Sequence, residues 1–125
     1  MGNMAFSHTV DQILAETKTV TRLLGWLKLK PGDRFWAVEK TMGLKPGEKV
    51  RRLKLCECVS NRRESLMDVT LADVAREGFP DMSQYEFIRM FCQINRPCQD
   101  DWLVSRIEFK YVAEAASAAG GEIKP

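Results

Sequence analysis

The 125-residue sequence lacks the features on which several classes of protein depend. No apolar run approaches the roughly 20 residues of a membrane-spanning helix, and the first residues lack the basic and apolar regions of a secretory signal. Neither a GxxxxGKS/T nor a GxGxxG loop for binding phosphates occurs. Length and composition are those of one soluble globular domain. We expect this domain to be cytoplasmic, monomeric and without a membrane partner.

Metal-binding residues are also scarce. The one histidine, His8, lies near the start of the chain, where a surface or capping role is the simplest explanation. The four cysteines, Cys56, Cys58, Cys92 and Cys98, have C-x-C and C-x₅-C spacing, which matches the CxxC pairs of zinc sites poorly. We therefore expect free thiols, no bound metal and no cofactor.

The net charge of +2 hides a strong asymmetry along the chain. Residues 18–63 contain 13 Lys and Arg against 4 Asp and Glu, whereas residues 64–125 contain 6 against 11. A basic half of this size can attract phosphate groups. It can equally consist of solvated strands whose lysines protect sheet edges from pairing with other chains. Composition leaves both interpretations open.

Hydrophobic periodicity predicts strands at 4–7, 34–40, 50–66 and 102–112, and extended chain after residue 18. It predicts helices at 10–14, 70–79 and 81–95. This order favours an α+β fold, with a small, curved, mostly antiparallel β-barrel and flanking short helices. We assign residues 1–113 to a single domain and the small, Gly-rich segment 114–125 to a flexible C-terminal tail.

Local signals predict where these elements begin and end. Pro-Gly turns are expected at 29–33 and 45–48, and Thr9 or Ser7, Thr70 and Ser83 are candidate N-caps. The 50–66 strand has no cleanly apolar side, so its buried face stays open. We expect its segment NRRES, residues 61–65, to form a solvated turn, with a phosphate-facing loop as the alternative.

The stretch ETKTVTR, residues 16–22, holds the residues that most suggest catalysis. Lys18 and Thr21 are three apart, so a bend at a helix-to-strand junction would bring the amine and the hydroxyl together. A lysine that gives up a proton beside another cation, such as Arg22, can then take the proton of a threonine hydroxyl. Glu77, just before Gly78, is the candidate acid for a leaving group. The simpler alternative is a solvated lysine, a strand threonine and a surface glutamate.

Four segments together resemble the ASCH-domain family of the PUA-like superfamily. They are ILAETKTVTR, LKPGDRFWAV, LADVAREGFPDMSQYEFIRMF and SRIEFKYV, and the likeness runs from Phe6 to Val112. The resemblance implies a small β-barrel with flanking helices, a cleft lined by basic residues, and RNA or nucleotide binding. Some small members of the family are amidohydrolases that remove acyl groups from the N4 amine of cytidine. They use a Lys and a Thr of a K-T-x-T element and a Glu from the helical region.

Lys18 and Thr21 match the K-T-x-T element directly, and Glu77 matches the glutamate less closely because loop lengths differ within the family. The segment 41–52 is an insertion that the most compact amidohydrolases lack. The resemblance therefore implies an enzyme in which Thr21 attacks the acyl carbonyl, Lys18 accepts the hydroxyl proton and Glu77 protonates the leaving amine.

Two further contributions to this enzyme are expected. Arg22 or a backbone N–H would stabilise the oxyanion, and Trp26 or Trp36 would stack on the pyrimidine of the substrate. The alternative is a non-catalytic RNA-binding domain that uses the basic residues Arg51, Arg52, Arg62 and Arg63. A ribonuclease is a third possibility, which the lack of a second histidine makes less natural.

Overall fold

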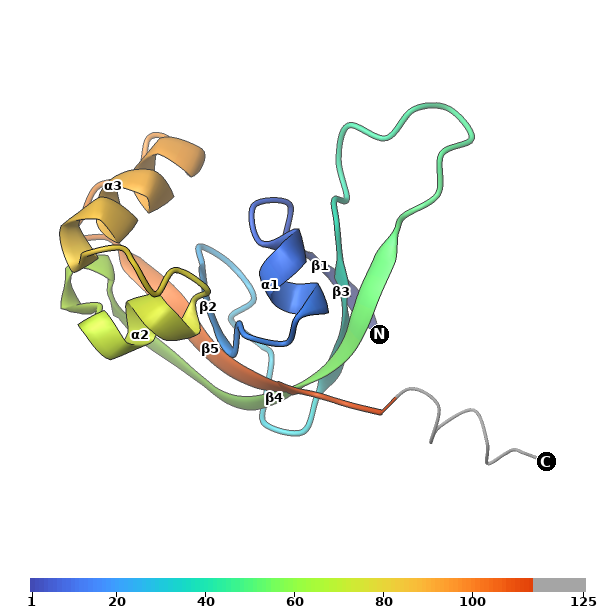
Figure 1. The fold of residues 1–125 in the computed structure, drawn as a ribbon, viewed down its shortest axis with the longest axis horizontal. Coiled ribbons are helices and arrows are strands. Elements are labelled where there is room, and N and C mark those ends of the chain that lie inside the picture. The colour runs from blue at the N-terminus through green and yellow to red at the C-terminus, as the bar shows by residue number, and fades with distance from the viewer. Residues whose placement is uncertain (114–125) are drawn as a thin grey trace.

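Five strands form one curled sheet in the computed structural model, which describes residues 1–113 of the chain (Figure 1). The strands are β1 (Gly2–Ala5), β2 (Val20–Leu23), β3 (Arg34–Val38), β4 (Arg52–Ser65) and β5 (Leu103–Tyr111). The helices are α1 (Val10–Leu14), α2 (Leu71–Arg76) and α3 (Gln84–Ile94), with a 3₁₀ turn at Leu66–Asp68. The predicted tail, 114–125, lies outside the described residues.

The order of the strands in the sheet is β1-β3-β4-β5-β2, so β1 and β2 are its two edges. Three of the four pairings are antiparallel, and β1 pairs with β3 in parallel. The long strand β4 curls through the sheet and pairs with β3 in its first half and with β5 along most of its length. The predicted α+β fold with a small curved β-barrel and flanking short helices is confirmed, in the form of a half-barrel (Figure 1).

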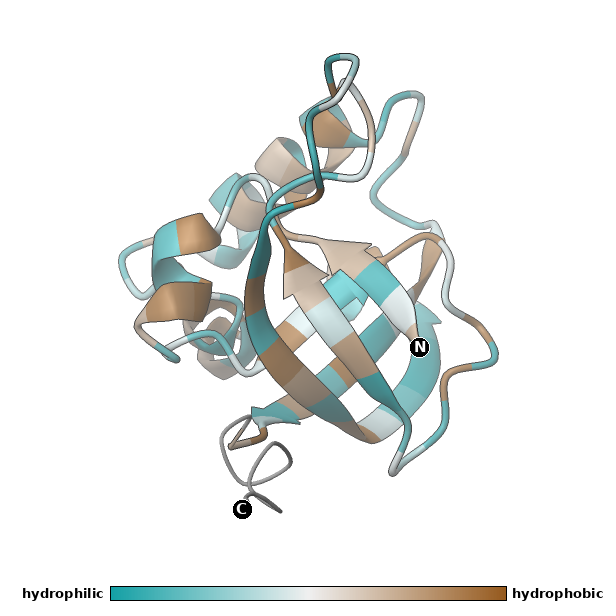
Figure 2. Cartoon of the chain, turned by 90° about the vertical axis from the view of Figure 1, so that its right-hand side faces the viewer, coloured by the Kyte–Doolittle hydropathy of each residue, from teal (hydrophilic) through white to brown (hydrophobic). Residues whose placement is uncertain are grey.

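The buried face of β4, which the sequence left open, is the face that carries the cysteines. Cys56 and Cys58 are buried, whereas Val59 is 42% exposed. Hydrophobic and hydrophilic residues alternate along the strands of the sheet (Figure 2). In β4 this alternation is interrupted by a β-bulge between Cys58 and Ser60, where the register against β5 shifts. One extra residue there explains why no single apolar stripe runs along the whole strand.

The expected solvated turn at residues 61–65 is wrong. These residues continue β4, where they pair with residues 103–107 of β5. Arg62 and Arg63 are exposed, as a turn would have made them, but they alternate on a strand. The cross-strand backbone ladder thus outweighs the polar composition that suggested a turn.

Two hydrophobic clusters form the core. The first fills the half-barrel and contains Phe6, Phe35, Cys56, Ile107 and Phe109. The second lies where α2 and α3 pack against the far ends of β4 and β5, and it contains Val74, Phe87, Phe91 and Val104. The pocket described below opens between these two clusters.

The predicted turns and two of the helix caps are confirmed. The Thr70 side chain accepts a hydrogen bond from the Asp73 N–H at the start of α2, and Ser83 forms a full capping box with Glu86 at the start of α3. Gly32 and Gly47 have positive φ angles of 93° and 80° in the Pro-Gly turns. Thr9 is the N-cap residue of α1, but its side chain makes no capping hydrogen bond.

No helix in the described part of the chain combines the length and the apolar character needed to cross a membrane. Within residues 1–113, no group of three or more His, Cys, Asp or Glu side chains is gathered as a metal ion would require. All four cysteines are free thiols, and the Sγ atoms of Cys92 and Cys98 lie 3.2 Å apart.

Candidate functional site

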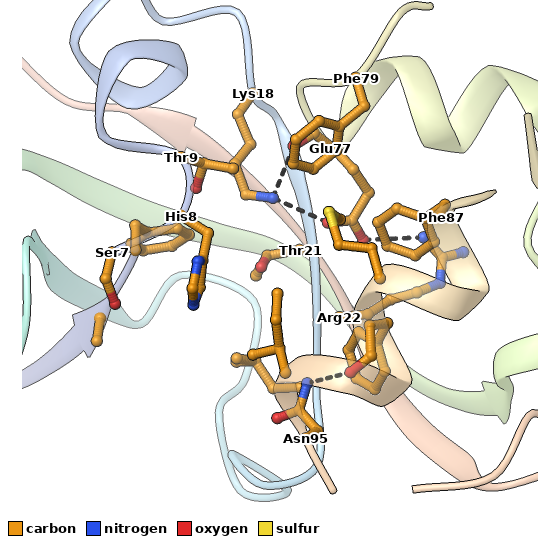
Figure 3. Close-up of a pocket in the computed structure, with 16 residues that line it drawn as sticks. Ser7, His8, Thr9, Lys18, Thr21, Arg22, Glu77, Phe79, Phe87 and Asn95 are labelled. Carbon is orange, nitrogen blue, oxygen red and sulfur yellow. Dashed lines mark hydrogen bonds and ion pairs between the residues drawn. The ribbon is translucent and has the colours of Figure 1, made fainter. Parts of the chain in front are cut away.

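A pocket of about 230 Å³ opens between the segment after β1, the strand β2 and the helices α2 and α3 (Figure 3). Its polar residues include Lys18, Thr21, Arg22 and Glu77. Its apolar wall is formed mainly by four phenylalanines, Phe6, Phe79, Phe87 and Phe91, together with Leu23, Met90 and Ile94. The pocket therefore combines buried charged groups with an aromatic surface, which is the usual composition of a small-molecule site.

The chain reverses direction between α1 and β2, and this bend places Lys18. Glu16 has a positive φ of 59°, which ends the short helix without a glycine. The Thr19 N–H then donates to the Arg76 carbonyl, and the Tyr111 hydroxyl donates to the Lys18 carbonyl. The backbone is thus tied to α2 on one side and to β5 on the other. The Lys18 side chain is directed inward and is 4% exposed.

Glu77 is placed by the end of α2, where it is the C-cap residue. Gly78 follows with a φ of 106°, and a Cβ built there would lie 2.8 Å from Cγ of Gln12. Only glycine therefore fits the close approach of this helix end to α1. The turn presents both the carboxylate and the carbonyl of Glu77 to Lys18, whose Nζ donates to each at 2.8 Å.

The Lys18 amine and the Thr21 hydroxyl were expected to meet, but the direct partner of Lys18 is Glu77. The hydrogen bonds of the Lys18 ammonium go to Glu77, and among the described residues none joins it to the Thr21 hydroxyl. A carboxylate and a carbonyl attract an ammonium more strongly than a neutral hydroxyl does. Thr21 is nevertheless buried beside them and lines the same pocket (Figure 3). The structure thus brings Lys18, Thr21 and Glu77 to one cavity, with Glu77 as the direct partner of Lys18.

Arg22 lies at the pocket but is occupied by carboxylates. Its NH1 is 3.1 Å from Oε2 of Glu77, and its NH2 is 2.7 Å from both Glu64 Oε2 and Asp73 Oδ2. Burial by itself would lower the pKa of Arg22, but hydrogen bonds to Glu64 and Asp73 and the charge of Glu77 raise that pKa above its ordinary value. The guanidinium is therefore a fixed cation that holds Glu77.

Asp73 is the second anchor of this charged cluster. Hydrogen bonds from Arg106, at 2.7 and 3.0 Å, lower the pKa of Asp73 well below its usual range, against the opposing effect of burial. Arg22 and Arg76 add to the same shift. Asp73 is thus a permanent anion that ties α2 to β2 and β5.

Neither tryptophan that was expected to stack on a substrate lines the pocket. Trp26 is half-buried, packs against Phe35 at a ring-centroid distance of 6.2 Å, and covers Gly2. Trp36 lies on β3, where the Arg52 guanidinium sits 4.6 Å from its ring centre. Their predicted stacking role is therefore corrected, because the loop after β2 carries Trp26 away from the pocket and towards β3.

The aromatic surface comes instead from phenylalanines. The helical spacing of Phe87 and Phe91 predicts core residues, and they are core residues that also face the cavity. Phe6 belongs to the other core cluster, and the Lys18 Nζ lies 5.9 Å from its ring centre. Hydrophobic periodicity in the sequence predicts that a side chain is buried, but not whether it lies in the core or in the wall of a pocket. The place of these phenylalanines at the site could therefore not be predicted from it.

His8 is exposed and lines the pocket together with Ser7 and Thr9. The surface position expected for His8 is correct, but its place at the pocket had no signal in the sequence. It depends on how the segment between β1 and α1 folds over the sheet, with the Thr9 N–H donating to the Phe6 carbonyl at 3.0 Å.

No protein-family model matches the chain, and no curated protein matches it in sequence. Solved structures do share its fold. Protein EF3133 from Enterococcus faecalis V583, of family DUF984, superposes with a TM-score of 0.63 at 13% identity, covering 89% of this chain and 78% of that one. The hypothetical protein PH0355 superposes with a TM-score of 0.60 at 19% identity, covering 89% and 98%.

An ASCH domain from Lactobacillus crispatus JV V101 superposes with a TM-score of 0.54 at 17% identity, covering 88% of this chain and 78% of that domain. The elements that the resemblance to ASCH domains implied, a small curved barrel with flanking helices, are those observed. The fold implied by the four sequence segments is therefore confirmed: this chain has the fold of an ASCH domain.

Proposed function

We propose that the protein is an amidohydrolase that removes the acyl group from N4-acylated cytosine or cytidine. The observation that carries the proposal is the meeting of Lys18, Glu77 and Thr21 at one pocket of about 230 Å³. A cavity of about 150 Å³ already holds benzene, so a pyrimidine ring with a small acyl group is of suitable size. The K-T-x-T element of residues 18–21 and the ASCH-type fold support the same activity.

Lys18 and Glu77 share the proton that the reaction needs. Its transfer along their 2.8 Å hydrogen bond gives a neutral amine beside a carboxylic acid, and a buried site tolerates the neutral pair. The Lys18 amine then takes the Thr21 hydroxyl proton as Oγ forms a bond to the acyl carbon. Glu77 gives its proton to N4 as the C–N bond breaks. Cytidine leaves, and the acyl group remains as an ester on Thr21.

Water completes the cycle through the same two residues. After the first half, Lys18 is again an ammonium and Glu77 a carboxylate, so the proton can pass between them a second time. The Lys18 amine takes a proton from water as the hydroxide adds to the ester carbon. Glu77 returns a proton to Thr21 Oγ as the ester bond breaks. The products are a carboxylic acid and the unchanged enzyme.

A backbone N–H is the better donor to the oxyanion, because Glu77, Glu64 and Asp73 occupy the terminal nitrogens of Arg22. In the β2–β5 ladder, the Phe109 N–H donates to the Thr19 carbonyl, so residues 19, 21 and 23 bond to β5. The backbone N–H of Arg22 lies between residues 21 and 23, which face β5, so it points the other way, towards the open edge of the sheet. It directly follows the proposed nucleophile, a position suited to stabilise an oxyanion on the attacked carbonyl.

The two ends of the pocket differ in chemistry and suggest how the substrate lies. Ser7, His8 and Thr9 are on one side of Lys18 and Thr21, and Phe79 and Phe87 are on the other (Figure 3). Polar side chains at the exposed end suit the polar edge of cytosine and the sugar. The aromatic end suits an apolar acyl group. The scissile amide would then span the polar centre.

The exposed arginines support RNA binding less well. The four arginines form two pairs at opposite ends of β4: Arg51 and Arg52 at its start, and Arg62 and Arg63 near its end. The two pairs are separated by about ten residues, which span at most roughly 33 Å of strand. Arg51 and Arg62 are also paired with Glu39 and Glu64. They do not form the single basic patch that a phosphate backbone prefers.

The test is the release of carboxylic acid from N4-acetylcytidine by wild type and Lys18→Ala, followed by ultraviolet absorbance. Lys18→Ala is expected to lose the activity and keep its circular dichroism spectrum, because Glu77 remains paired with Arg22. Lys54→Ala is the matched control, since Lys54 forms a partly exposed ion pair with Glu16. Undiminished turnover in Lys18→Ala would overturn the proposal. Tight, salt-sensitive RNA binding without hydrolysis would favour an RNA-binding domain instead.

A further inference from the structure

Among the hydrogen bonds and ion pairs of the described residues, none joins Glu64 directly to Lys18 or Glu77, yet Glu64 is linked to that pair through a buried cation. Glu64 Oε2 lies 2.7 Å from NH2 of Arg22, and NH1 of the same guanidinium lies 3.1 Å from Oε2 of Glu77. Glu77 Oε1 then accepts the hydrogen bond of Lys18 at 2.8 Å. The guanidinium is planar, so fixing NH2 also fixes the direction of NH1. Glu64 is not among the residues that line the pocket.

Asp73, the other carboxylate that pairs with NH2 of Arg22, has three arginine partners and joins α2 to the sheet. Arg22, Arg76 and Arg106 all donate to its carboxylate. Glu64 is attached more simply. In the part of the chain that the structure describes, it pairs with the buried Arg22 and with Arg62, whose side chain is 61% exposed. The charge of Glu64 can therefore be changed without dismantling the joint between α2 and the sheet.

The charges that face this cluster come from every element packed against it. β2 contributes Arg22, and Lys18 lies just before that strand. α2 contributes Asp73, Arg76 and its C-cap Glu77. β4 contributes Arg62 and Glu64, and β5 contributes Arg106, which is 3.6 Å from Glu108. Within residues 1–113, Glu64 and Asp73 pair with NH2 of Arg22, whereas Glu77 pairs with NH1.

We propose that Glu64 is a positioning residue that, through Arg22, sets how the proton is divided between Lys18 and Glu77. The inference rests on the proposed amidohydrolase function, in which that proton must reach Glu77 before Thr21 can attack. Glu64 offsets part of the positive charge of Arg22. Without this offset, Arg22 stabilises the Glu77 carboxylate more strongly and the carboxylic acid forms less often. Loss of the Glu64 charge thus slows the reaction without touching the substrate.

The sign of the pH effect follows from the same charges. Activity requires that Lys18 and Glu77 together hold one shared proton. Hydrolysis is therefore expected to be fastest at an intermediate pH and to fall on both sides of it. Removing a negative charge nearby makes every proton easier to lose, so both limbs of the pH profile move to lower pH. Removing the positive charge of Arg62 moves them to higher pH.

The first test compares Glu64→Gln with Glu57→Gln, a glutamate of the same strand that pairs with Arg34 and Lys110 outside the pocket. Hydrolysis of N4-acetylcytidine is measured across pH. For Glu64→Gln we expect kcat to fall about tenfold and KM to stay within about twofold. The pH profile of kcat/KM should move to lower pH by roughly half a pH unit to one pH unit. Glu57→Gln should match wild type. A Glu64→Gln enzyme with a wild-type profile and kcat would overturn the inference.

A second pair of variants avoids any change to the buried cluster. Arg62→Gln removes the exposed partner of Glu64, and Arg63→Gln removes its exposed neighbour, which instead donates to the Leu103 carbonyl. Arg62→Gln should move the profile to higher pH, and by more than Arg63→Gln does. Equal shifts for the two, or a shift to lower pH, would overturn the role of Glu64. Failure of wild type to hydrolyse any N4-acylcytosine would instead overturn the proposed function, and this role with it.

Discussion

Lys18 and Glu77 are joined twice, because the lysine ammonium donates to both the carboxylate and the backbone carbonyl of Glu77 at 2.8 Å. The two residues are 59 positions apart in sequence, and both are almost fully buried. The second oxygen of the Glu77 carboxylate is held by Arg22. Glu77 thus pairs with two buried cations, whereas Lys18 has Glu77 as its one charged partner among residues 1–113.

This asymmetry predicts unequal effects on stability. Glu77→Met leaves Lys18 without a counter-ion and Arg22 with one fewer, so we expect the free energy of unfolding to fall by about 3–5 kcal/mol. Lys18→Met leaves Glu77 paired with Arg22, and we expect a smaller loss of about 1–2 kcal/mol. Urea denaturation of both variants at neutral pH measures the difference. Equal losses would show that Arg22 does not compensate for Lys18.

The Thr21 hydroxyl is predicted to be the nucleophile. Thr21→Val has nearly the same shape but no hydroxyl, so we expect hydrolysis of N4-acetylcytidine to fall by about a thousandfold or more. Thr21→Ser keeps the hydroxyl and should retain measurable turnover. Steady-state rates of both variants, with circular dichroism to check folding, make the comparison. A Thr21→Val enzyme as active as Thr21→Ser would assign the attack to water.

The acyl preference is predicted to depend on α3, because Met90 lines the pocket and packs against the cluster that contains Phe87 and Phe91. Met90→Ala enlarges that end, and we expect the ratio of kcat/KM for N4-benzoylcytosine over N4-acetylcytosine to rise about tenfold. The control is Met42→Ala in the 39–51 connection, where the methionine is 82% exposed. The same ratio in Met90→Ala, Met42→Ala and wild type would place the acyl group elsewhere.

Asp73 predicts how the fold responds to acid. Its pKa is lowered in the folded protein, so its contribution to stability is present above the ordinary pKa of an aspartate, about 3.9, and is lost as pH falls further. Asp73→Asn should lower stability at pH 7 and remove part of the decline between about pH 4 and pH 2. Thermal unfolding midpoints over that range test this. A decline as steep as that of wild type would exclude Asp73 as a source of acid sensitivity.

The strands, the capped helices and the Pro-Gly turns could be predicted because their signals are local. Thr70, Ser83 and Glu86 cap helices through neighbours three residues away, and Gly32 meets the φ requirement of its own turn. The strand predicted over 50–66 was correct as far as residue 65, but the polar composition of 61–65 suggested a turn within it. That segment stays in the strand because it pairs with β5, about forty residues later.

The site was predictable only in part, for a related reason. Lys18 and Thr21 are three residues apart, so a bend suffices to bring them to one cavity. The partners of Arg22 come from β4 and from α2 and its C-cap, and no spacing in the sequence indicates that Glu64 and Asp73 meet there. Trp26 and Trp36 have the right chemistry for stacking but the wrong location, whereas Phe87 and Phe91 combine a core role with a place at the pocket.

The account depends most directly on whether the intact protein breaks the amide bond of N4-acetylcytidine. Enzyme and substrate are mixed in equal amounts, the ultraviolet spectrum is followed, and the acetate formed is measured. The pocket built by Lys18, Glu77 and Thr21 predicts complete conversion to cytidine, with one acetate for each cytidine. A spectrum that stays that of N4-acetylcytidine, with no acetate produced by the folded protein, would contradict the account.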